Sequence, residues 1–422
     1  MFIHIDLDCY FVSAHRTIDK NLLNIPVAVG GRNNNDIFSS EKLTRKASVN
    51  RACFSSKIIS SNSKNNDEYF KDENGKIRGI ITTSSYEARA FGVKTAMSVN
   101  EALRFCPHLK MIAPNYELYD NLSNRLKELL ELEIPIIEQF SIDEFFGDLS
   151  GYIEEDEAFI FARNLKIKIF EKLGLPASIG VAPTKYLSKL MTNFAKPNGV
   201  KLLKKDDIEE FTKDVLVENF TGIGKSFCEK LRGYNIKTLG DIRNNQKLLY
   251  SWGKIGVDTY NRVCGIRDNK LTINKERKSL GIGRSFDVVS NREELKRRVM
   301  ILSRYLSFIV KKENHNPLSY QIQIKYEYNI LSKAQENTNK IFNEFDFKNS
   351  MIKLFKEADK HKNHGVIQLY ITVFNFAKKN EHTFNLFEYE DDLKKEVLDK
   401  NIQNLREKFG VDIVKSAYEL KS

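Results

Sequence analysis

Ile3-His4-Ile5-Asp6-Leu7-Asp8, at the start of this chain, alternates apolar and polar residues with the period of a half-buried β-strand. A second acidic segment, Ser141-Ile142-Asp143-Glu144, lies far away in sequence. Carboxylates on strands that meet in a fold can hold Mg²⁺. Two such ions can clamp the attacking and leaving oxygens of a phosphoryl displacement. If the two segments converge, the chain is a phosphoryl-transfer enzyme; if they do not, they are ordinary acidic turns.

The composition indicates several folded domains and a basic surface. A chain of 422 residues is long enough for two to four domains, and its 41% hydrophobic content excludes a fully disordered protein. Lys and Arg number 67 against 56 Asp and Glu, a net charge of +11. Such a balance suits a protein that meets a nucleic acid, although it also suits simple solubility.

Cysteine usage and hydropathy point to a cytoplasmic protein. The five cysteines are scattered and form no C-x-x-C pair, which argues against a disulfide framework or a zinc site. No apolar run has the length of a membrane helix, and the N-terminus has no signal-peptide pattern. We therefore expect a reducing compartment and no membrane partner.

One long polar excursion interrupts otherwise regular segments. Asn, Ser and Lys dominate residues 33–78. From about residue 204 short helices with glycine turns follow, and after a basic linker near 270–280 a new α+β unit begins. In that unit Ser290-x-x-Glu293 predicts a capping box. The clearest expected helices are 116–132, 157–173, 184–195 and 388–410, and the clearest strands are 2–8, 178–182, 320–328 and 366–376.

Several basic or hydroxyl-bearing groups are candidates for phosphate contact. Tyr86 and Arg89 are three residues apart and share a helix face, where Arg offers a bidentate fork. Residues 184–205 hold six lysines and no acidic residue, and residues 275–312 hold eleven basic residues against four acidic ones. Solvated helix faces would also explain these patterns. The candidates in these two runs are Lys185, Lys189, Lys196, Arg277 and Arg284.

The turn Thr221-Gly222-Ile223-Gly224-Lys225 has the form of a helix-hairpin-helix motif. Glycines let the backbone approach a phosphate, and consecutive amides form an anion nest. Such a contact would position a nucleic-acid strand without reading its sequence. Gly222, Gly224 and Lys225 are therefore candidate DNA-binding residues.

Taken together and in this order, the motifs resemble the Y family of translesion DNA polymerases, and in particular its bacterial polymerase IV branch. The polymerase V catalytic branch shares these motifs. The resemblance covers nearly the whole chain. It rests on Ile5-Asp6-Leu7-Asp8-Cys9-Tyr10-Phe11, Tyr86-Glu87-Ala88-Arg89-x-Phe91-Gly92, Ser141-Ile142-Asp143-Glu144 and Ala195-Lys196-Pro197-Asn198-Gly199.

The resemblance implies an α+β right-hand polymerase with palm, fingers, a helical thumb and a separate α+β little finger. The implied palm covers 1–10 and 115–203, and the fingers cover 11–114 with the polar insertion at about 33–78. The remaining regions would be a thumb with the helix-hairpin-helix at 204–272, a linker at 273–279, the little finger at 280–378, and a C-terminal tail and helix at 379–422.

The resemblance also implies roles for individual residues. Asp6, Asp143 and Glu144 would be the catalytic carboxylates and, with the Leu7 carbonyl, the ligands of two Mg²⁺ ions, while Asp8 would lie behind them. Phe11 would be the steric gate that excludes a ribose 2′-hydroxyl. The nucleotide-binding set would be Tyr10, Phe11, Tyr86, Arg89 and Lys196.

The implied activity is template-directed, low-fidelity addition of deoxynucleotides past template damage by a monomer on primer-template DNA. The 33–78 insertion is longer than this connection usually is in the family. Thr383-Phe384-Asn385-Leu386-Phe387 is a partial match to a sliding-clamp peptide, with Thr383 in place of the usual Gln. Phe384, Leu386 and Phe387 either dock on a clamp or pack on the body of the protein.

Two other function classes stand beside the polymerase. A catalytically silent DNA-binding homologue would bind DNA and add no nucleotide. A metal-dependent nuclease would cleave DNA without added nucleotides and would leave Tyr86, Arg89 and Lys196 without a role.

Overall fold

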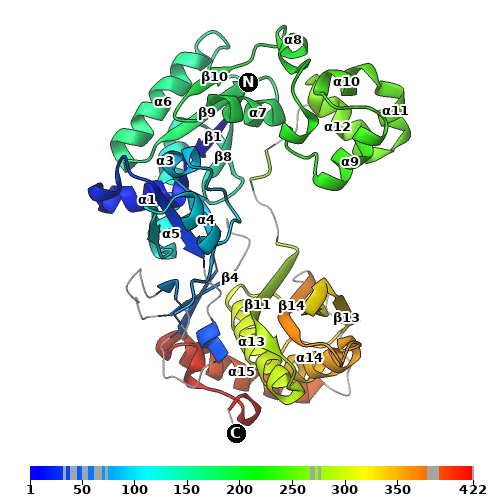
Figure 1. Ribbon diagram of the computed structural model, residues 1–422. Coiled ribbons are helices and arrows are strands. Elements are labelled where there is room, and N and C mark those ends of the chain that lie inside the picture. The colour runs from blue at the N-terminus through cyan, green and yellow to red at the C-terminus, as the bar shows by residue number, and fades with distance from the viewer. Residues whose placement is uncertain are drawn as a thin grey trace. The chain divides into compact units, whose positions relative to one another are not determined.

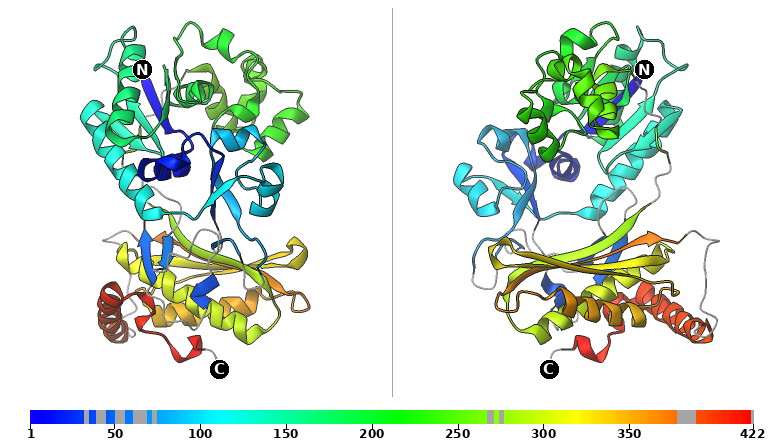
Figure 2. Two further views of the ribbon diagram at one scale, coloured as in Figure 1. Left: turned by 60° about the vertical axis from the view of Figure 1, so that its left-hand side comes forward. Right: turned by 90° about the vertical axis from the view of Figure 1, so that its right-hand side faces the viewer.

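The computed structural model describes residues 1–31, 35–38, 45–49, 56–60, 69–71, 75–266, 271–273, 277–377 and 389–420. At 35–36, 45–49, 56–60 and 389–393 only the backbone is described. The chain divides into two units, Met1–Gly31 with Asp72–Lys275 and Arg32–Lys71 with Glu276–Ser422 (Figures 1 and 2).

A five-stranded sheet is the centre of the first unit. Its order is β10-β9-β1-β8-β7, and β1 is antiparallel to both β8 and β9. The helices α6 and α7 both pack on β9, and α7 also packs on β1. Figure 1 shows the sheet between these two helices. The bounds are β1 Phe2–Leu7, β7 Ile136–Gln139, β8 Glu144–Asp148, β9 Ala177–Ala182, β10 Val200–Leu202, α5 Tyr116–Glu133, α6 Ala158–Leu173 and α7 Lys185–Ala195.

Strand alternation on β1 separates an apolar face from a polar one. Ile3 and Ile5 are fully buried on one face. His4 faces α7, where its Nδ1 lies 2.9 Å from the Thr192 Oγ1, and Asp6 shares that face. The carboxylate of Asp6 therefore emerges beside the C-terminal end of α7.

A smaller sheet and a helical region complete the first unit. The three-stranded sheet has the order β5-β2-β6, and α1, α3 and α4 pack around it. Its elements are α1 Tyr10–Ile18, β2 Val27–Gly31, β5 Ile80–Ser84, α3 Tyr86–Ala90, α4 Val99–Phe105 and β6 Lys110–Ile112. The helical region consists of α8 Ile208–Thr212, α9 Lys225–Gly233, α10 Leu239–Asn244, α11 Gln246–Ser251 and α12 Lys254–Cys264.

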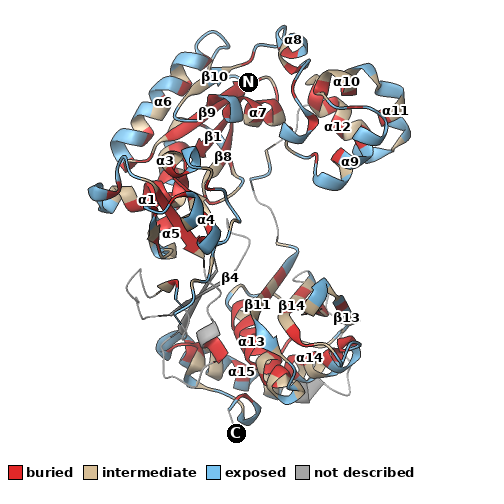
Figure 3. Cartoon of the chain, in the orientation of Figure 1, coloured by how far each residue is buried: buried red, intermediate tan, exposed pale blue. Residues whose placement is uncertain are grey.

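The second unit is an antiparallel four-stranded sheet of order β11-β14-β12-β13 covered by two helices. The helix α13 is buried along much of its length (Figure 3). The core of this unit contains Leu302 and Leu306 from α13 together with Ile322 and Ile371 from the sheet. The bounds are β11 Ser279–Val289, α13 Arg292–Lys312, β12 Pro317–Tyr326, β13 Leu331–Asn337, α14 Glu344–Ala358 and β14 Val366–Phe376.

Two further segments pack on this second unit. One lies within the polar insertion and comprises the 3-10 turn η2 Asn35–Phe38 and the hairpin of β3 Arg45–Val49 and β4 Ser56–Ser60. The other is the C-terminal tail, with α15 Tyr389–Phe409, η5 Val411–Ile413 and η6 Ala417–Glu419. The sequence did not indicate that residues 32–71 group with residues 276–422 instead of with the strands that flank them.

Buried ion pairs attach the tail to α13 and α14. Arg304 is buried and pairs with Asp412 and Glu419, both at 2.6 Å. Lys348 pairs with the same Glu419 at 2.7 Å. Buried pairs add little net stability over apolar packing, but removal of one partner leaves a costly unpaired charge. Loss of any one partner of this network would therefore be costly, although the intact network adds little net stability.

The long periodic segments match their predictions closely. The helix predicted at 116–132 is α5, and the strand predicted at 366–376 is β14. The capping box predicted at Ser290 is wrong, because Asn291 is the N-cap of α13 and its side chain accepts hydrogen bonds from the amides of Glu293 and Glu294. Asn caps a helix as well as Ser does, so the pattern left two adjacent candidates.

We predict that Gly180→Ala destabilises the first unit. An added Cβ at this position in β9 would lie 2.2 Å from the Ser188 carbonyl oxygen and 2.3 Å from the Thr192 nitrogen, which are backbone atoms of α7. The helix must shift, at a cost of about 1–3 kcal/mol, and the midpoint of thermal unfolding should fall. Gly233→Ala is the control, since nothing lies within 4 Å of its added Cβ. Equal unfolding midpoints for the two variants would contradict the prediction.

Candidate active site and nucleic-acid interface

The two acidic segments converge through the pairing of β1 with β8. Asp6 and Glu144 are register partners on these antiparallel strands. The Leu7 amide donates to the Asp143 carbonyl at 3.1 Å, which holds the end of β1 against the turn before β8. Directly opposed residues on antiparallel strands point to the same face. The carboxylates of Asp6 and Glu144 therefore share one face of the sheet.

Ser141 organises the turn that carries Asp143. Its Oγ donates to Asp143 Oδ1 at 2.5 Å and accepts hydrogen bonds from the amides of Asp143 and Glu144 at 3.3 and 3.1 Å. The turn lets adjacent residues escape strict strand alternation, so Asp143 and Glu144 can serve one site. We did not identify Ser141 from the sequence as an organising residue, although its place two residues before Asp143 is typical of such turns.

Burial and crowding disfavour ionisation of the Asp6 and Asp143 carboxyl groups. Burial raises the pKa of Asp6 to about 7, opposed by the Lys196 ammonium and reinforced by Glu144 and Asp143. Burial also raises the pKa of Asp143, against the hydrogen bond from Ser141. Crowded carboxylates of this kind are stabilised by a cation.

Two lysines from α7 and its C-cap supply positive charge. Lys196 Nζ lies 2.7 Å from Asp6 Oδ1, and Lys189 Nζ lies 2.5 Å from Glu144 Oε1. Within the part of the chain that the structure describes, no three His, Cys, Asp or Glu side chains gather as a metal-binding group. The ammonium groups neutralise Asp6 and Glu144 in the way that metal ions would. The oxygen-donor chemistry, with the Leu7 carbonyl nearby, fits Mg²⁺.

Asp8 has a different environment from Asp6. Its buried carboxylate accepts hydrogen bonds from the Ser178 Oγ at 2.9 Å, the Asn198 amide at 2.7 Å and the Tyr86 hydroxyl at 3.1 Å. Each partner comes from a different segment of the first unit. Asp8 therefore ties β1 to β9, to α3 and to the turn after α7, and its lone pairs are largely used.

The expected nucleotide-binding residues lie around these carboxylates. Tyr86 and Arg89 are on the short helix α3, with the guanidinium 4.9 Å from the centre of the Tyr86 ring. Burial and the Asp8 carboxylate raise the pKa of Tyr86, so its hydroxyl stays a donor. Lys196 approaches Asp6 from the C-terminal end of α7. Lys196 thus contacts Asp6 directly, and Tyr86 contacts Asp8.

Tyr10 and Phe11 begin helix α1, directly after Asp8 and Cys9. The Tyr10 ring is buried and its hydroxyl donates to the Tyr119 carbonyl at 2.5 Å. The Phe11 ring is partly exposed and stacks on Tyr119. Tyr119 was not identified from the sequence, because it lies in an amphipathic helix where it reads as a core residue.

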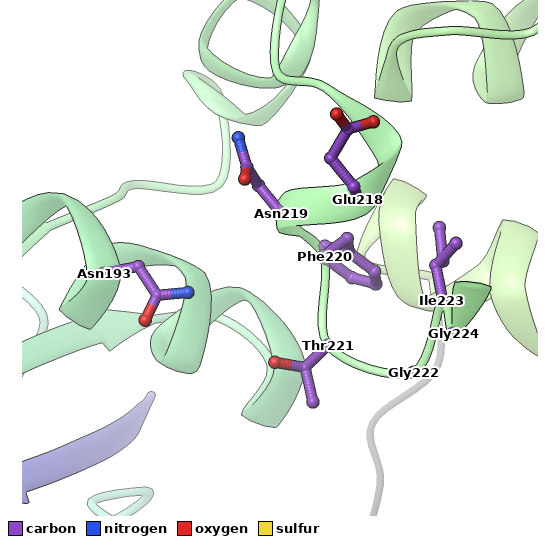
Figure 4. Close-up of a pocket in the computed structure, with 8 residues that line it drawn as sticks. All are labelled: Asn193, Glu218, Asn219, Phe220, Thr221, Gly222, Ile223 and Gly224. Atoms are coloured by element: carbon purple, nitrogen blue, oxygen red, sulfur yellow. The ribbon is translucent and has the colours of Figure 1, made fainter. Parts of the chain in front are cut away.

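The glycine turn adopts a conformation that suits contact with a phosphate. Gly222 has φ +102°, which only glycine adopts readily, and Gly224 directly precedes α9. Residues 218–224 and Asn193 line an open pocket of about 630 Å³ (Figure 4). Lys225 is exposed at the first position of α9. The first amides of a helix have no intrahelical acceptor and can bind an anion.

Two lysines expected to bind DNA are instead engaged by carboxylates of the sheet. Lys185 is buried and its ammonium donates to Glu138 at 2.5 Å. The same ammonium lies 4.7 Å from the centre of the Phe146 ring. Lys189 is held by Glu144. Neither side chain presents a free cation to a phosphate, so we remove both from the proposed DNA-binding set. Their residue type suggested a basic surface, but the helix face on which they lie is directed at the sheet.

Two of the remaining expected residues belong to the second unit, and three lie outside the described residues. Arg284 lies on β11 of the second unit, where its Nη1 donates to the Gly283 carbonyl at 2.7 Å, and Arg277 lies two residues before that strand begins. Phe384, Leu386 and Phe387 lie outside the described residues. Among the helices that the structure describes, none combines the length and the apolar character that a membrane crossing needs.

Comparisons with known proteins agree with this arrangement. Residues 5–193 match the model of the impB/mucB/samB family. The chain is 31% identical over 305 residues to the DNA polymerase IV of Lactococcus lactis subsp. cremoris (strain SK11), covering 71% of this chain and 84% of that protein. It is 26% identical over 426 residues to the DNA polymerase IV of Bacillus anthracis, covering 100% and 93% respectively.

A solved structure shares the fold. A Y-family DNA polymerase chimera (Dbh-Dpo4(243-245)-Dbh) superposes with a TM-score of 0.72 at 20% identity, covering 89% of this chain and 98% of that one. The fold is thus that of a right-hand polymerase with palm, fingers, thumb and little finger, as predicted. The chain belongs to the Y family of DNA polymerases, as its motifs indicated. It is a DNA-directed DNA polymerase whose relatives include bacterial DNA polymerase IV enzymes.

We predict that Lys225→Ala weakens binding to duplex DNA. Loss of one phosphate contact should reduce the slope of log affinity against log salt by about 0.9. Fluorescence anisotropy over a series of salt concentrations measures this slope. Lys172→Ala, an equal charge change at an exposed position on α6, is the matched control and should leave the slope unchanged. A slope for Lys225→Ala equal to that of the parent protein would remove this turn from the DNA interface.

Proposed function

We propose that this polymerase extends a primer 3′ end on a DNA template by a two-metal mechanism, with low fidelity and with bypass of template damage. The observation that supports it most directly is the register pairing of Asp6 with Glu144. This pairing gathers partly buried carboxylates, whose charge calls for cations, beside candidate triphosphate-binding groups. A solved structure with a similar fold, the insertion ternary complex of Dbh DNA polymerase, also supports binding of substrates at such a site.

In this proposal Asp6, Asp143, Glu144 and the Leu7 carbonyl would hold two Mg²⁺ ions. The ions would supply charge neutralisation for the attacking and leaving oxygens. The primer 3′-hydroxyl loses its proton to solvent as its oxygen forms a bond to the α-phosphorus, and pyrophosphate leaves as the bond between the α-phosphorus and its bridging oxygen breaks. Positioning and charge neutralisation are the main demands of phosphoryl transfer, so the protein needs no covalent nucleophile.

Lys196 would have two successive partners in this reaction, first Asp6 and then the triphosphate. Its ammonium pairs with Asp6 when no cation is bound. With the Asp6 carboxylate neutralised by a cation, the Lys196 ammonium would be available to the triphosphate, together with the Arg89 fork, the Tyr86 hydroxyl and the amide of Tyr10. Phe11 acts as the steric gate at the sugar. Phosphate contacts by Gly222, Gly224, Lys225, Arg277 and Arg284 would hold the DNA, and the peptide at 383–387 would serve a sliding clamp.

We predict that Asp143→Asn and Glu144→Gln each abolish primer extension. Both changes keep the side-chain shape and remove the charge, so transition-state stabilisation worth several kcal/mol is lost and the rate should fall by at least about 10²-fold. Single-nucleotide primer extension in Mg²⁺, with a chelator lane, measures the rate. Asp148→Asn, at the opposite end of the same strand, is the control and should retain activity.

The same assay separates the alternative functions. A silent homologue would bind DNA without incorporation in the parent protein, and a nuclease would shorten the primer when no nucleotide is added. Undiminished extension by both Asp143→Asn and Glu144→Gln would refute the two-metal assignment. Templates with and without a lesion, run side by side, test the proposed bypass.

A further inference from the structure

The proposed steric gate lies on a buried aromatic ring. The ring centres of Phe11 and Tyr119 are 4.2 Å apart and their planes differ by 13°, so the rings are stacked. Tyr119 lies on α5 and is 0% exposed, whereas Phe11 is partly exposed. The Tyr119 ring is therefore fixed by the core, and the Phe11 ring that stacks on it has solvent on one side.

Tyr119 is itself held from several directions. Its hydroxyl lies 2.8 Å from His15 Nε2, and its backbone carbonyl accepts the hydrogen bond from Tyr10. The Tyr116 ring meets it edge-on, with ring centres 5.9 Å apart. Burial lowers the pKa of His15, so the imidazole is neutral near pH 7 and can either donate to the phenol or accept from it. The groups facing His15 include Asp19, whose charge opposes this lowering.

We propose that Tyr119 and His15 are positioning residues for sugar selection. Tyr119 fixes the orientation of the Phe11 ring, and His15 fixes the orientation of Tyr119. Without the stacked partner, the Phe11 ring can change rotamer and leave space for a 2′-hydroxyl. This inference rests on the proposed role of Phe11 as the gate.

The test compares kcat/KM for a deoxynucleotide and for its ribonucleotide counterpart. Tyr119→Leu should raise the ribonucleotide-to-deoxynucleotide ratio by about tenfold, the scale on which a single shape change in a pocket discriminates. Tyr119→Phe keeps the stacked ring and should have a smaller effect. His15→Ala should resemble Tyr119→Phe, and His15→Gln should restore the parent ratio because the amide can replace the imidazole in the hydrogen bond.

A double mutant identifies the route by which Tyr119 acts. Phe11→Ala should raise the ratio most, and Tyr119→Leu should add nothing in the Phe11→Ala background. If Phe11→Ala leaves the ratio unchanged, the gate itself is lost and this inference with it. If Phe11→Ala raises the ratio but Tyr119→Leu lowers both kcat/KM values equally, Tyr119 has only a structural role and the inference fails while the gate stands.

A separate observation concerns residues 32–71, which include most of the polar insertion and group with the second unit. Ile37 and Phe38 are buried in the core of the second unit, at 2% and 4% exposure. Arg297 Nη2 donates to the Phe38 carbonyl at 2.8 Å, and the Arg298 guanidinium lies 4.8 Å from the centre of the Phe38 ring. The strand β3 also lies against α13, and β4 lies against β11.

The insertion that packs in the second unit is covalently joined to the first unit at both of its ends. The insertion follows Gly31, the last residue of β2 in the first unit, and the chain returns to that unit at Asp72. Only five residues separate Gly31 from Ile37, so their Cα atoms can be at most about 20 Å apart. The little finger is thus connected to the rest of the chain by this anchor as well as by the linker that precedes β11.

We propose that the insertion is a second anchor that retains the little finger independently of the linker. The test places a protease site at residues 267–270 of the full chain and cuts it there. The two fragments should still elute as one species in size-exclusion chromatography at micromolar concentration. Ile37→Ser combined with Phe38→Ser should release the C-terminal fragment, because two buried apolar side chains become polar.

Two controls make the result decisive. Ile18→Ser changes an isoleucine that is 64% exposed in the first unit and should leave the fragments together. Thermal unfolding of the uncut double variant checks that the second unit still folds. Separation of the parent fragments would overturn the proposal, and so would continued association of the folded double variant.

Discussion

The antiparallel pairing of β1 with β8 is the constraint on which the candidate site depends. It places Asp6 opposite Glu144 and brings the Ser141–Asp143 turn to the end of β1. Carboxylates in such a place are poorly solvated and repel one another, which is why burial raises the pKa of Asp6 and of Asp143. The surrounding elements supply what this arrangement lacks, namely positive charge from α7 and hydrogen bonds from the adjoining turns.

Helix α7 is central to that compensation. Gly180 lets the helix approach β9 so closely that no side chain fits between them. This approach buries Lys185 against Glu138 and directs Lys189 and Lys196 at the carboxylates. Lys189 and Lys196 thereby pair with the site carboxylates, so any cation that binds there would compete with ammonium groups already in position.

The second unit shows how chain segments without a strong hydrophobic pattern are nevertheless fixed in place. Arg297 donates to the carbonyl of Phe38 and to that of Glu419, and so joins α13 to both the insertion and the tail. Arg304 and Lys348 pair with the buried carboxylate of Glu419. Removal of any one partner would leave a buried charge unpaired, which disfavours other placements of these segments.

The sequence by itself determined the family, the α+β fold and the long elements, because strand alternation and helical periodicity are local properties and the motifs occur in a recognisable order. Only the family resemblance assigned different roles to Asp6 and Asp8, because strand alternation places both side chains on one face of β1. The tertiary structure alone decided that Lys185 is buried, that Tyr119 underlies Phe11 and that the insertion packs with residues 276–422. Each of these depends on contacts between segments distant in sequence, and no local pattern encodes which distant surface a residue meets.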